Sequence, residues 1–312
     1  MRHEDPQHGN RPPWHQINIE FDSRDVAERH AIAYLGPALM AAESTGLLTS
    51  WFFTRKQWWR FRYLPTSSRA AGEAKRLLED AARSMQGSGY ASRWVENTYE
   101  PETHAFGGEE GMAAAHNLFH QDSRYIFEYL RPLGGGTLNS ASNHRSKRRE
   151  LSVLLCTALM RAAGQDWHEQ GDIWTRVADH RPTKTSAQPE QRRTLKAAIK
   201  RLIAVDTGPE TALRTGGTLE FATDWLTIFE QSRETLKILS GEGLLTRGIR
   251  SVTAHHVIFH WNRLGLPYQT QANVALAAKE TIFENRRVCR RMKTTYRLSL
   301  PQGGQSVIPH HE

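Results

Sequence analysis

Cysteine is scarce in this chain: among 312 residues only Cys156 and Cys289 occur. Two cysteines cannot form a disulfide framework or a four-cysteine zinc site. Long apolar runs are also missing, since no segment approaches the roughly eighteen consecutive apolar residues that indicate a membrane span. The polar N-terminus lacks the apolar core of a signal peptide. We therefore expect a protein of the cytoplasm, without a membrane partner and without a disulfide framework.

Acidic residues are outnumbered by basic ones. The chain has 41 Lys and Arg against 33 Asp and Glu, which gives a net charge of +8 and an isoelectric point near 9.6. Much of the excess is concentrated at residues 144–149 and 286–293. Such clusters are typical of a solvated basic surface, and they can also bind nucleic acid or another acidic partner. No zinc-finger or RNP pattern supports the nucleic-acid interpretation.

Hydrophobic patterning places a strand-rich segment after a polar N-terminus. Residues 1–13 and 301–312 are polar, and we expect both ends to be disordered. Between them, the first hundred residues predict two amphipathic helices, one capped by Asp22 or Ser23 and running to about Ser44 and the other at 70–85. They also predict four strands, at 14–21, 51–53, 58–63 and 93–99. The order strand–helix–strand–strand–helix–strand is typical of a ferredoxin-like fold.

Beyond Gly107 and Gly108 the strand pattern disappears and helical periodicity replaces it, as in the apolar stripe of Leu151, Leu155 and Leu159. This periodicity predicts seven helices, at 111–131, 147–164, 168–180, 189–205, 220–240, 249–265 and 271–285. The predicted fold class is therefore α+β. A ferredoxin-like βαββαβ part at 14–108 is followed by a mainly helical part at 109–300.

Two arginines stand on the most aromatic predicted strand. In the segment WWRFRY at 58–63, Arg60 and Arg62 share one face because side chains alternate along a strand. Two adjacent guanidinium groups on a rigid strand form a good carboxylate receptor, because each can bind with two hydrogen bonds. The same pattern is typical of arginines on a solvated sheet face.

Histidines are concentrated in the predicted helix at 249–265. His256, His260 and Arg263 share one helix face, because they are four and three residues apart. Histidine titrates near neutral pH, so this face offers a general acid or base beside a cation. A buried helix whose histidines only form hydrogen bonds would show the same spacing.

Two further patterns concern carboxylates and metal. Glu100 and Glu102 lie in a loop containing Pro and Gly, where they can act as acid or base or pair with the arginines. His116 and His120 have the spacing of a metal-binding helix, but residue 117 is Asn, so the Glu of an HExxH motif is missing. We therefore expect no metal site.

Several segments together resemble a known family. They are WFF at 51–53, WWRFRY at 58–63, YEPE at 99–102, FGG at 106–108, HNLFHQDS at 116–123, RRELSVLL at 148–155 and HWNRL at 260–264. In this order they resemble the thiopeptide-type bacteriocin biosynthesis family, whose members are similar to the C-terminal elimination domain of class I lantibiotic dehydratases. The resemblance covers about residues 14–285.

The resemblance implies work on a ribosomally made precursor peptide, with no cofactor. A partner subunit, a glutamylating dehydratase, attaches glutamate from glutamyl-tRNA to Ser or Thr. The elimination domain then removes glutamate and leaves dehydroalanine or dehydrobutyrine. Arg60 and Arg62 would hold the carboxylates of the leaving glutamate, and His260 would transfer the proton. Arg263 or Asn262 would stabilise the enolate-like charge. Any contact with tRNA would be indirect, through the partner.

One segment departs from the family pattern. Fused dehydratases usually carry an arginine in the segment that matches residues 100–105, where this chain has Pro101, Thr103, His104 and Ala105. One anion contact is therefore missing, and His104 is expected to replace it in part. The expected substrate-binding residues are Glu102, His104, Asn262 and His256.

Two other functions stay open. The same fold serves pyridine synthases, which join two dehydroalanines of a thiopeptide precursor by aza-[4+2] cycloaddition and need no glutamate pocket. The arginine pair together with His260 favours elimination. The third alternative is non-enzymatic: a subunit that binds the leader peptide at the edge of the N-terminal sheet, or a basic protein that binds nucleic acid.

Overall fold

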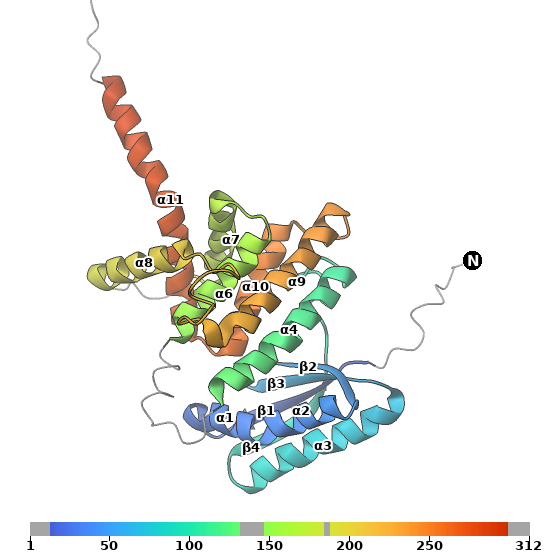
Figure 1. Cartoon of the computed structure of the whole chain (residues 1–312). Helices are drawn as coiled ribbons and strands as arrows, with labels where there is room; N and C mark the ends of the chain where they lie inside the picture. The colour runs from blue at the N-terminus through green and yellow to red at the C-terminus, as the bar shows by residue number, and fades with distance from the viewer. Residues whose placement is uncertain (1–12, 132–146, 184–187, 299–312) are drawn as a thin grey trace, which may run out of the picture.

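The computed structural model describes residues 13–131, 147–183 and 188–298. A four-stranded sheet and its helices come first, and a larger group of helices follows (Figure 1). This confirms the expected α+β class. The ends expected to be disordered lie, apart from Pro13, outside the described residues.

The strands lie in the order β2-β3-β1-β4, and every neighbouring pair is antiparallel. They are β1 (His15–Phe21), β2 (Leu48–Arg55), β3 (Trp59–Pro65) and β4 (Ala91–Thr98). One face of the sheet is apolar: Ile17, Phe53 and Phe61 are buried in the same core as residues of α2 (Gly36–Ser44) and α3 (Ser68–Gly87). Side chains alternate between faces, so the opposite face receives the polar residues of β1 and β3.

The first helical segment is not the continuous helix that the sequence predicted from a cap at Asp22 or Ser23 to about Ser44. Helix α1 (Arg24–His30) passes into a π-helical turn (Ala31–Leu35) before α2 begins at Gly36. Pro37 accounts for the difference, because its ring has no N–H to donate and crowds the carbonyl one turn back.

The helical part contains the helices that the periodicity predicted, with most ends within three residues. They are α4 (Glu109–Leu130), α6 (Arg148–Ala162), α7 (Trp167–His180), α8 (Pro189–Ala204), α9 (Thr223–Gly241), α10 (Ile249–Leu264) and α11 (Tyr268–Leu298), with a 3-10 turn (Glu220–Ala222) before α9. The predicted end of the last helix at 285 is wrong. No Gly or Pro interrupts the following residues, so the helix continues. None of the described helices is long and apolar enough to cross a membrane.

Helix α4 contacts strand β2 and satisfies two of its backbone groups. The Trp51 N–H donates to Nδ1 of His120 at 3.2 Å, and the Phe53 N–H donates to Oγ of Ser123 at 3.4 Å. An uncovered edge strand is a template for aggregation, so these polar side chains protect the sheet. Nε2 of His120 lies 3.3 Å from Oε1 of Glu43, so protein groups contact both ring nitrogens.

A buried ion-pair network joins the sheet to the helical part. Glu28 of α1 accepts hydrogen bonds from Arg148 of α6 at 2.6 and 2.8 Å and from Arg55 of β2 at 2.5 Å. Burial alone would raise the pKa of Glu28, but the two guanidinium charges lower it to about 2. Arg148 belongs to the basic segment 144–149, so this residue has a structural contact rather than a solvated position. Residues 144–146 lie outside the described residues.

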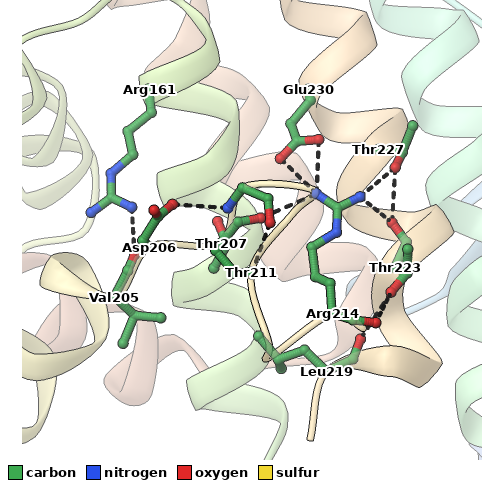
Figure 2. A network of polar contacts seen from close by, with 11 residues as sticks. Arg161, Val205, Asp206, Thr207, Thr211, Arg214, Leu219, Thr223, Thr227 and Glu230 are labelled. Atoms are coloured by element: carbon green, nitrogen blue, oxygen red, sulfur yellow. Dashed lines mark hydrogen bonds and ion pairs between the residues drawn. The ribbon is translucent and has the colours of Figure 1, made fainter. Parts of the chain in front are cut away.

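The connection between α8 and α9 is held by a second buried cation, Arg214 (Figure 2). Its Nη1 donates to both carboxylate oxygens of Glu230 at 3.0 Å and to the Thr207 carbonyl at 3.1 Å, and its Nη2 donates to the Thr223 carbonyl at 2.9 Å. Arg161 of α6 donates to the carbonyl of the residue that follows α8. In this segment, which has little regular structure, arginine side chains donate the hydrogen bonds that backbone N–H groups would donate to these carbonyls in a helix or sheet.

The Glu28 network leads to a prediction about stability. Glu28→Gln leaves Arg55 and Arg148 buried without a counter-charge, so we expect the free energy of unfolding at pH 7 to fall by about 3 kcal/mol. Urea unfolding measures the change. The matched control is Glu79→Gln, because Glu79 pairs with the more exposed Lys75 and Arg83 and is expected to cost less than ~1 kcal/mol.

The same network predicts a pH dependence. The pKa of Glu28 is lowered from 4.5 to about 2, so its stabilisation is present above pH 4.5 and is lost as the pH falls toward 2. The difference in unfolding free energy between wild type and Glu28→Gln should therefore shrink over this range. A difference that stays constant from pH 7 to pH 3 would contradict the assignment.

Candidate functional site

The polar face of the sheet carries Arg60 and Arg62, as the alternation of β3 predicted. Arg62 lies opposite Gln16 on β1, and Arg60 lies opposite Asn18 on the same strand. The intervening Phe61 points into the apolar core on the other face. The two guanidinium groups therefore rise from one side of a rigid strand.

Arg62 is buried among neutral groups. Its Nε donates to Oε1 of Gln16 at 2.8 Å, and its Nη1 donates to Oγ1 of Thr54 at 3.0 Å. The guanidinium carbon lies 5.1 Å from the ring centre of Phe52 and 4.9 Å from that of Tyr99. Burial, above all, lowers the pKa of Arg62 to about 10. These contacts orient the cation without neutralising it.

Lys56, Arg60 and Arg62 form one group of cations, here called the sheet cluster. Among the described residues none of the three forms an ion pair, and the buried Nε of Arg60 has no hydrogen-bond partner. Burial and then the charge of Arg60 lower the pKa of Lys56, and Glu102 opposes that shift. Unpaired cations at a partly buried site favour the binding of an anion.

The loop after β4 brings Glu102 to the sheet cluster. Its backbone is folded on itself, since the Glu102 carbonyl accepts from the Ala105 N–H at 2.8 Å. Gly107 and Gly108 have φ angles of 85° and 103°, which only glycine adopts without strain. The Thr246 N–H donates to the Gly107 carbonyl at 2.8 Å and ties the loop to the segment before α10. The side chains of Glu102 and His104 are exposed.

A tyrosine–histidine pair borders the same face. The Tyr99 hydroxyl lies 2.9 Å from Nε2 of His116. Burial raises the pKa of Tyr99, and burial together with the charge of Arg62 lowers the pKa of His116 to about 4. The histidine is therefore neutral at pH 7 and accepts the hydroxyl proton in a hydrogen bond. The sequence had singled out His116 only for its spacing from His120.

His260 and Arg263 lie in a different environment, around a carboxylate that the sequence reasoning missed. Asp122 of α4 accepts from Nδ1 of His260 at 3.0 Å, from Nε of Arg263 at 2.7 Å and from Nε1 of Trp225 at 2.9 Å. Asp122 and Arg263 have no exposed surface, and His260 is 1% exposed. Burial alone would raise the pKa of Asp122, but the charges of His260 and Arg263 hold it below its usual value.

His256, His260 and Arg263 share one face of α10, as their spacing predicted, and all three side chains are buried. The His256 ring lies 5.0 Å from the ring of Phe106 and 6.0 Å from that of Phe119. Burial and then the charge of Arg263 lower the pKa of His256 to about 3, so its imidazole is neutral. This face packs against α4 and α9 rather than beside the sheet cluster.

A neighbouring face of α10 carries His255 and Asn262. The half-buried His255 ring lies 5.0 Å from the ring of His180, at the end of α7. Oδ1 of Asn262 accepts from Nε2 of Gln271 at 3.3 Å. Burial lowers the pKa of His255, and the charges of His180 and Arg247 add to the shift. The charges that affect His255 thus include those of Arg247 and Arg181. The sequence had not indicated His255 as a site residue.

The structure thus brings some of the predicted site residues together and separates others. Arg60, Arg62 and Glu102 share one electrostatic environment, whereas His260 and Arg263 share the carboxylate of Asp122. The charge of Arg263 still affects the pKa of Arg62, to a smaller degree than burial does. One signal could have revealed Asp122: it is a carboxylate on the otherwise apolar face of the predicted helix 111–131.

A family model described as lantibiotic biosynthesis dehydratase C-term matches residues 14–282. Among curated protein sequences, none matches the chain.

Three solved structures have a similar fold. The tRNA-dependent lantibiotic dehydratase MibB from Microbispora sp. 107891 matches 92% of this chain at 15% identity with a TM-score of 0.61, and this chain spans only 29% of MibB. TsrL matches 88% of this chain at 15% identity with a TM-score of 0.56, over 96% of its own length. TbtD, the pyridine synthase from thiomuracin biosynthesis, matches 88% at 14% identity with a TM-score of 0.55, over 99% of its length. At these identities the likeness shows the fold alone.

The Asp122 network leads to a prediction about the helical core. Asp122→Asn removes the charge that compensates the fully buried Arg263, so we expect the free energy of unfolding to fall by about 3 kcal/mol or more. Asp172→Asn is the matched control, because Asp172 pairs with Arg250 at a more exposed position, and it is expected to cost less than ~1 kcal/mol. Equal stability of both variants in urea would contradict a structural role for Asp122.

Proposed function

Because the chain belongs to the lantibiotic biosynthesis dehydratase C-terminal family, we propose that it eliminates glutamate from glutamylated Ser or Thr of a ribosomally made precursor peptide. The products are dehydroalanine or dehydrobutyrine and free glutamate. The observation that carries the proposal is the sheet cluster: its cations form no ion pair among the described residues, and they lie near the loop after β4 that carries Glu102. A dicarboxylic leaving group fits such a site.

The reaction requires three changes at the substrate. A base removes the α-proton of the esterified residue, the electron pair forms the Cα–Cβ double bond, and the Cβ–O bond breaks so that the ester oxygen leaves as a carboxylate. Arg60 and Arg62 stabilise the charge that develops on that carboxylate. Glu102 lies close enough to Lys56 and Arg62 to affect the pKa of both. At that position its carboxylate can accept a hydrogen bond from the ammonium group of the glutamyl residue. The proposal needs no cofactor.

Two histidines of α10 are candidates for the proton transfer. The sequence motif selects His260, whose Nδ1 is oriented by Asp122 and whose buried Nε2 has no partner. The geometry favours His255, because a proton carrier must reach the substrate and His255 lies beside the cationic side chains while His260 is enclosed by Trp225 and Phe229. In this proposal His260 and Arg263 orient α10.

The proposed partners follow from the same chemistry. A glutamylating dehydratase subunit supplies the glutamyl ester that the reaction requires. The precursor peptide binds directly, and tRNA is contacted only through the partner subunit. All these steps take place in the cytoplasm, where glutamyl-tRNA is made.

Pyridine formation by cycloaddition is the second candidate. Two observations favour it. The pyridine synthase TbtD matches this chain over 99% of its own length, and the segment 100–105 lacks the arginine that fused dehydratases usually carry there. A cycloaddition between two dehydroalanines has no dicarboxylate to hold, so it leaves the unpaired cations of the sheet cluster unexplained.

Mass spectrometry of two peptides decides between the candidates. One synthetic precursor carries a glutamyl ester on Ser, and the other carries two dehydroalanines. Elimination predicts loss of glutamic acid from the first peptide and no change in the second. Loss of the leader from the second peptide, with the first unchanged, establishes the synthase. Binding of precursor without either reaction indicates a non-enzymatic subunit.

We predict that Arg60→Ala and Arg62→Ala each reduce the elimination rate by about two to three orders of magnitude and leave the glutamyl peptide unprocessed. The reason is the lost stabilisation of the developing carboxylate. Arg93→Ala on the edge strand is the matched control and is expected to retain the wild-type rate. Wild-type rates in both sheet variants, with circular dichroism unchanged, would exclude a carboxylate receptor at this face.

We predict different outcomes for two histidine variants. Asn keeps a hydrogen-bonding group near the position of Nδ1 but cannot carry a proton near neutral pH. His255→Asn is therefore expected to stop elimination with little change in stability, whereas His260→Asn keeps most of the rate. The opposite result would establish His260 as the proton carrier. The pKa of His255 is lowered from 6.5, so the wild-type rate should be constant at neutral pH and fall only below pH 6.5, as the base becomes protonated.

A further inference from the structure

A second group of basic side chains lies on the helical part, where α7 ends and α10 begins. It consists of His180, Arg181, Arg247 and His255 and is called the helical cluster here. The rings of His180 and His255 meet edge to face at 5.0 Å, and Nη1 of Arg247 donates to the Ala105 carbonyl at 3.3 Å. Within the described part of the chain, none of the four forms an ion pair with a carboxylate.

The two arginines of the helical cluster are held by neutral groups. Nε of Arg181 donates to Oε1 of Gln271 at 2.8 Å, and Gln271, which is only 3% exposed, donates to the Leu266 carbonyl at 2.8 Å. Arg247 is held by a backbone carbonyl of the loop after β4. Neutral acceptors orient a guanidinium and leave its charge available, so both arginines keep donors for an anion.

The helical cluster and the sheet cluster adjoin each other. Burial, and then the charges of both sheet arginines and of Arg181, lower the pKa of Lys56, so Lys56 lies within electrostatic reach of both groups. The loop that presents Glu102 to the sheet cluster also carries the Ala105 carbonyl that holds Arg247. Both clusters therefore approach the loop after β4, which carries Glu102 and Ala105.

A glutamyl ester requires two anion contacts of different kinds. One carboxyl group of its glutamate is the ester and becomes a carboxylate only when the Cβ–O bond breaks. The other carboxyl group is ionised before, during and after the reaction. Contacts to the carboxylate that forms during the reaction raise kcat. Contacts to the permanent carboxylate are equally strong in the ground state and the transition state, so they lower KM.

We infer that Arg181 and Arg247 bind the permanent carboxylate of the glutamyl group, while Arg60 and Arg62 bind the carboxylate that forms as glutamate leaves. This assignment rests on the proposed elimination and makes Arg181 and Arg247 specificity-determining residues that select glutamyl esters over uncharged aminoacyl esters. Arg247 comes from a distant part of the sequence and places a guanidinium beside Ala105, in the segment where the sequence lacks an arginine.

The test uses two synthetic peptides that differ only in the ester on one Ser: glutamyl or glutaminyl. The full chain is expected to prefer the glutamyl ester in kcat/KM by roughly tenfold to hundredfold, the value of one charge-assisted contact. Arg181→Gln and Arg247→Gln should each reduce that preference severalfold, through a higher KM for the glutamyl ester and an unchanged rate for the glutaminyl ester. Arg→Lys at either position should restore part of the preference, because the charge returns.

Matched controls are Arg176→Ala on the exposed side of α7 and Arg250→Ala at the start of α10, where Arg250 pairs with Asp172. Both controls should keep the wild-type preference. Gln variants with an unchanged preference, or with equal losses on both esters, overturn the assignment while elimination itself stands. A wild-type chain that cleaves neither ester overturns the proposed function, and this inference with it. Inhibition by free L-glutamate over L-glutamine, weakened in the Gln variants, provides a second measurement in support.

Discussion

The buried carboxylate of Asp122 sets the rotation of helix α10, and the arrangement of the charged groups depends on that rotation. A carboxylate without exposed surface requires donors, and His260, Arg263 and Trp225 supply them. Once these residues turn to α4 and α9, the neighbouring face with His255 turns toward the end of α7. The contacts of Asp122 inside the helical core thereby place His255, and not His260, near Arg181 and Arg247.

The chain uses arginine in two opposite ways. Arg55 and Arg148 share the carboxylate of Glu28, and the charges compensate within the protein. Arg62 is buried too, but its hydrogen-bond acceptors are neutral and its remaining neighbours are aromatic rings. An uncompensated buried cation costs stability, which a folded protein tolerates where an anion binds. This contrast distinguishes the structural cations from the candidate site.

Elimination and cycloaddition differ in the charge that the site must hold. Both concern residues derived from Ser in a modified peptide, but only elimination releases a dicarboxylic acid. The sheet cluster, on β3 and in the turn after β2, and the helical cluster, at the ends of α7 and α10, both approach the loop after β4. A site of this kind favours a substrate with two carboxyl groups, which is the reason that the proposal ranks elimination first.

The sequence by itself predicted most of the elements and showed which candidate residues share a face. Alternation on β3 put Arg60 and Arg62 on one face, and helical periodicity put His256, His260 and Arg263 on another, because both patterns depend only on local backbone geometry. Periodicity cannot state what a face contacts, so the burial of His260 against Asp122 was decided by tertiary packing. The approach of Arg247 to Ala105 was decided in the same way, since residues 142 positions apart meet only when the chain folds.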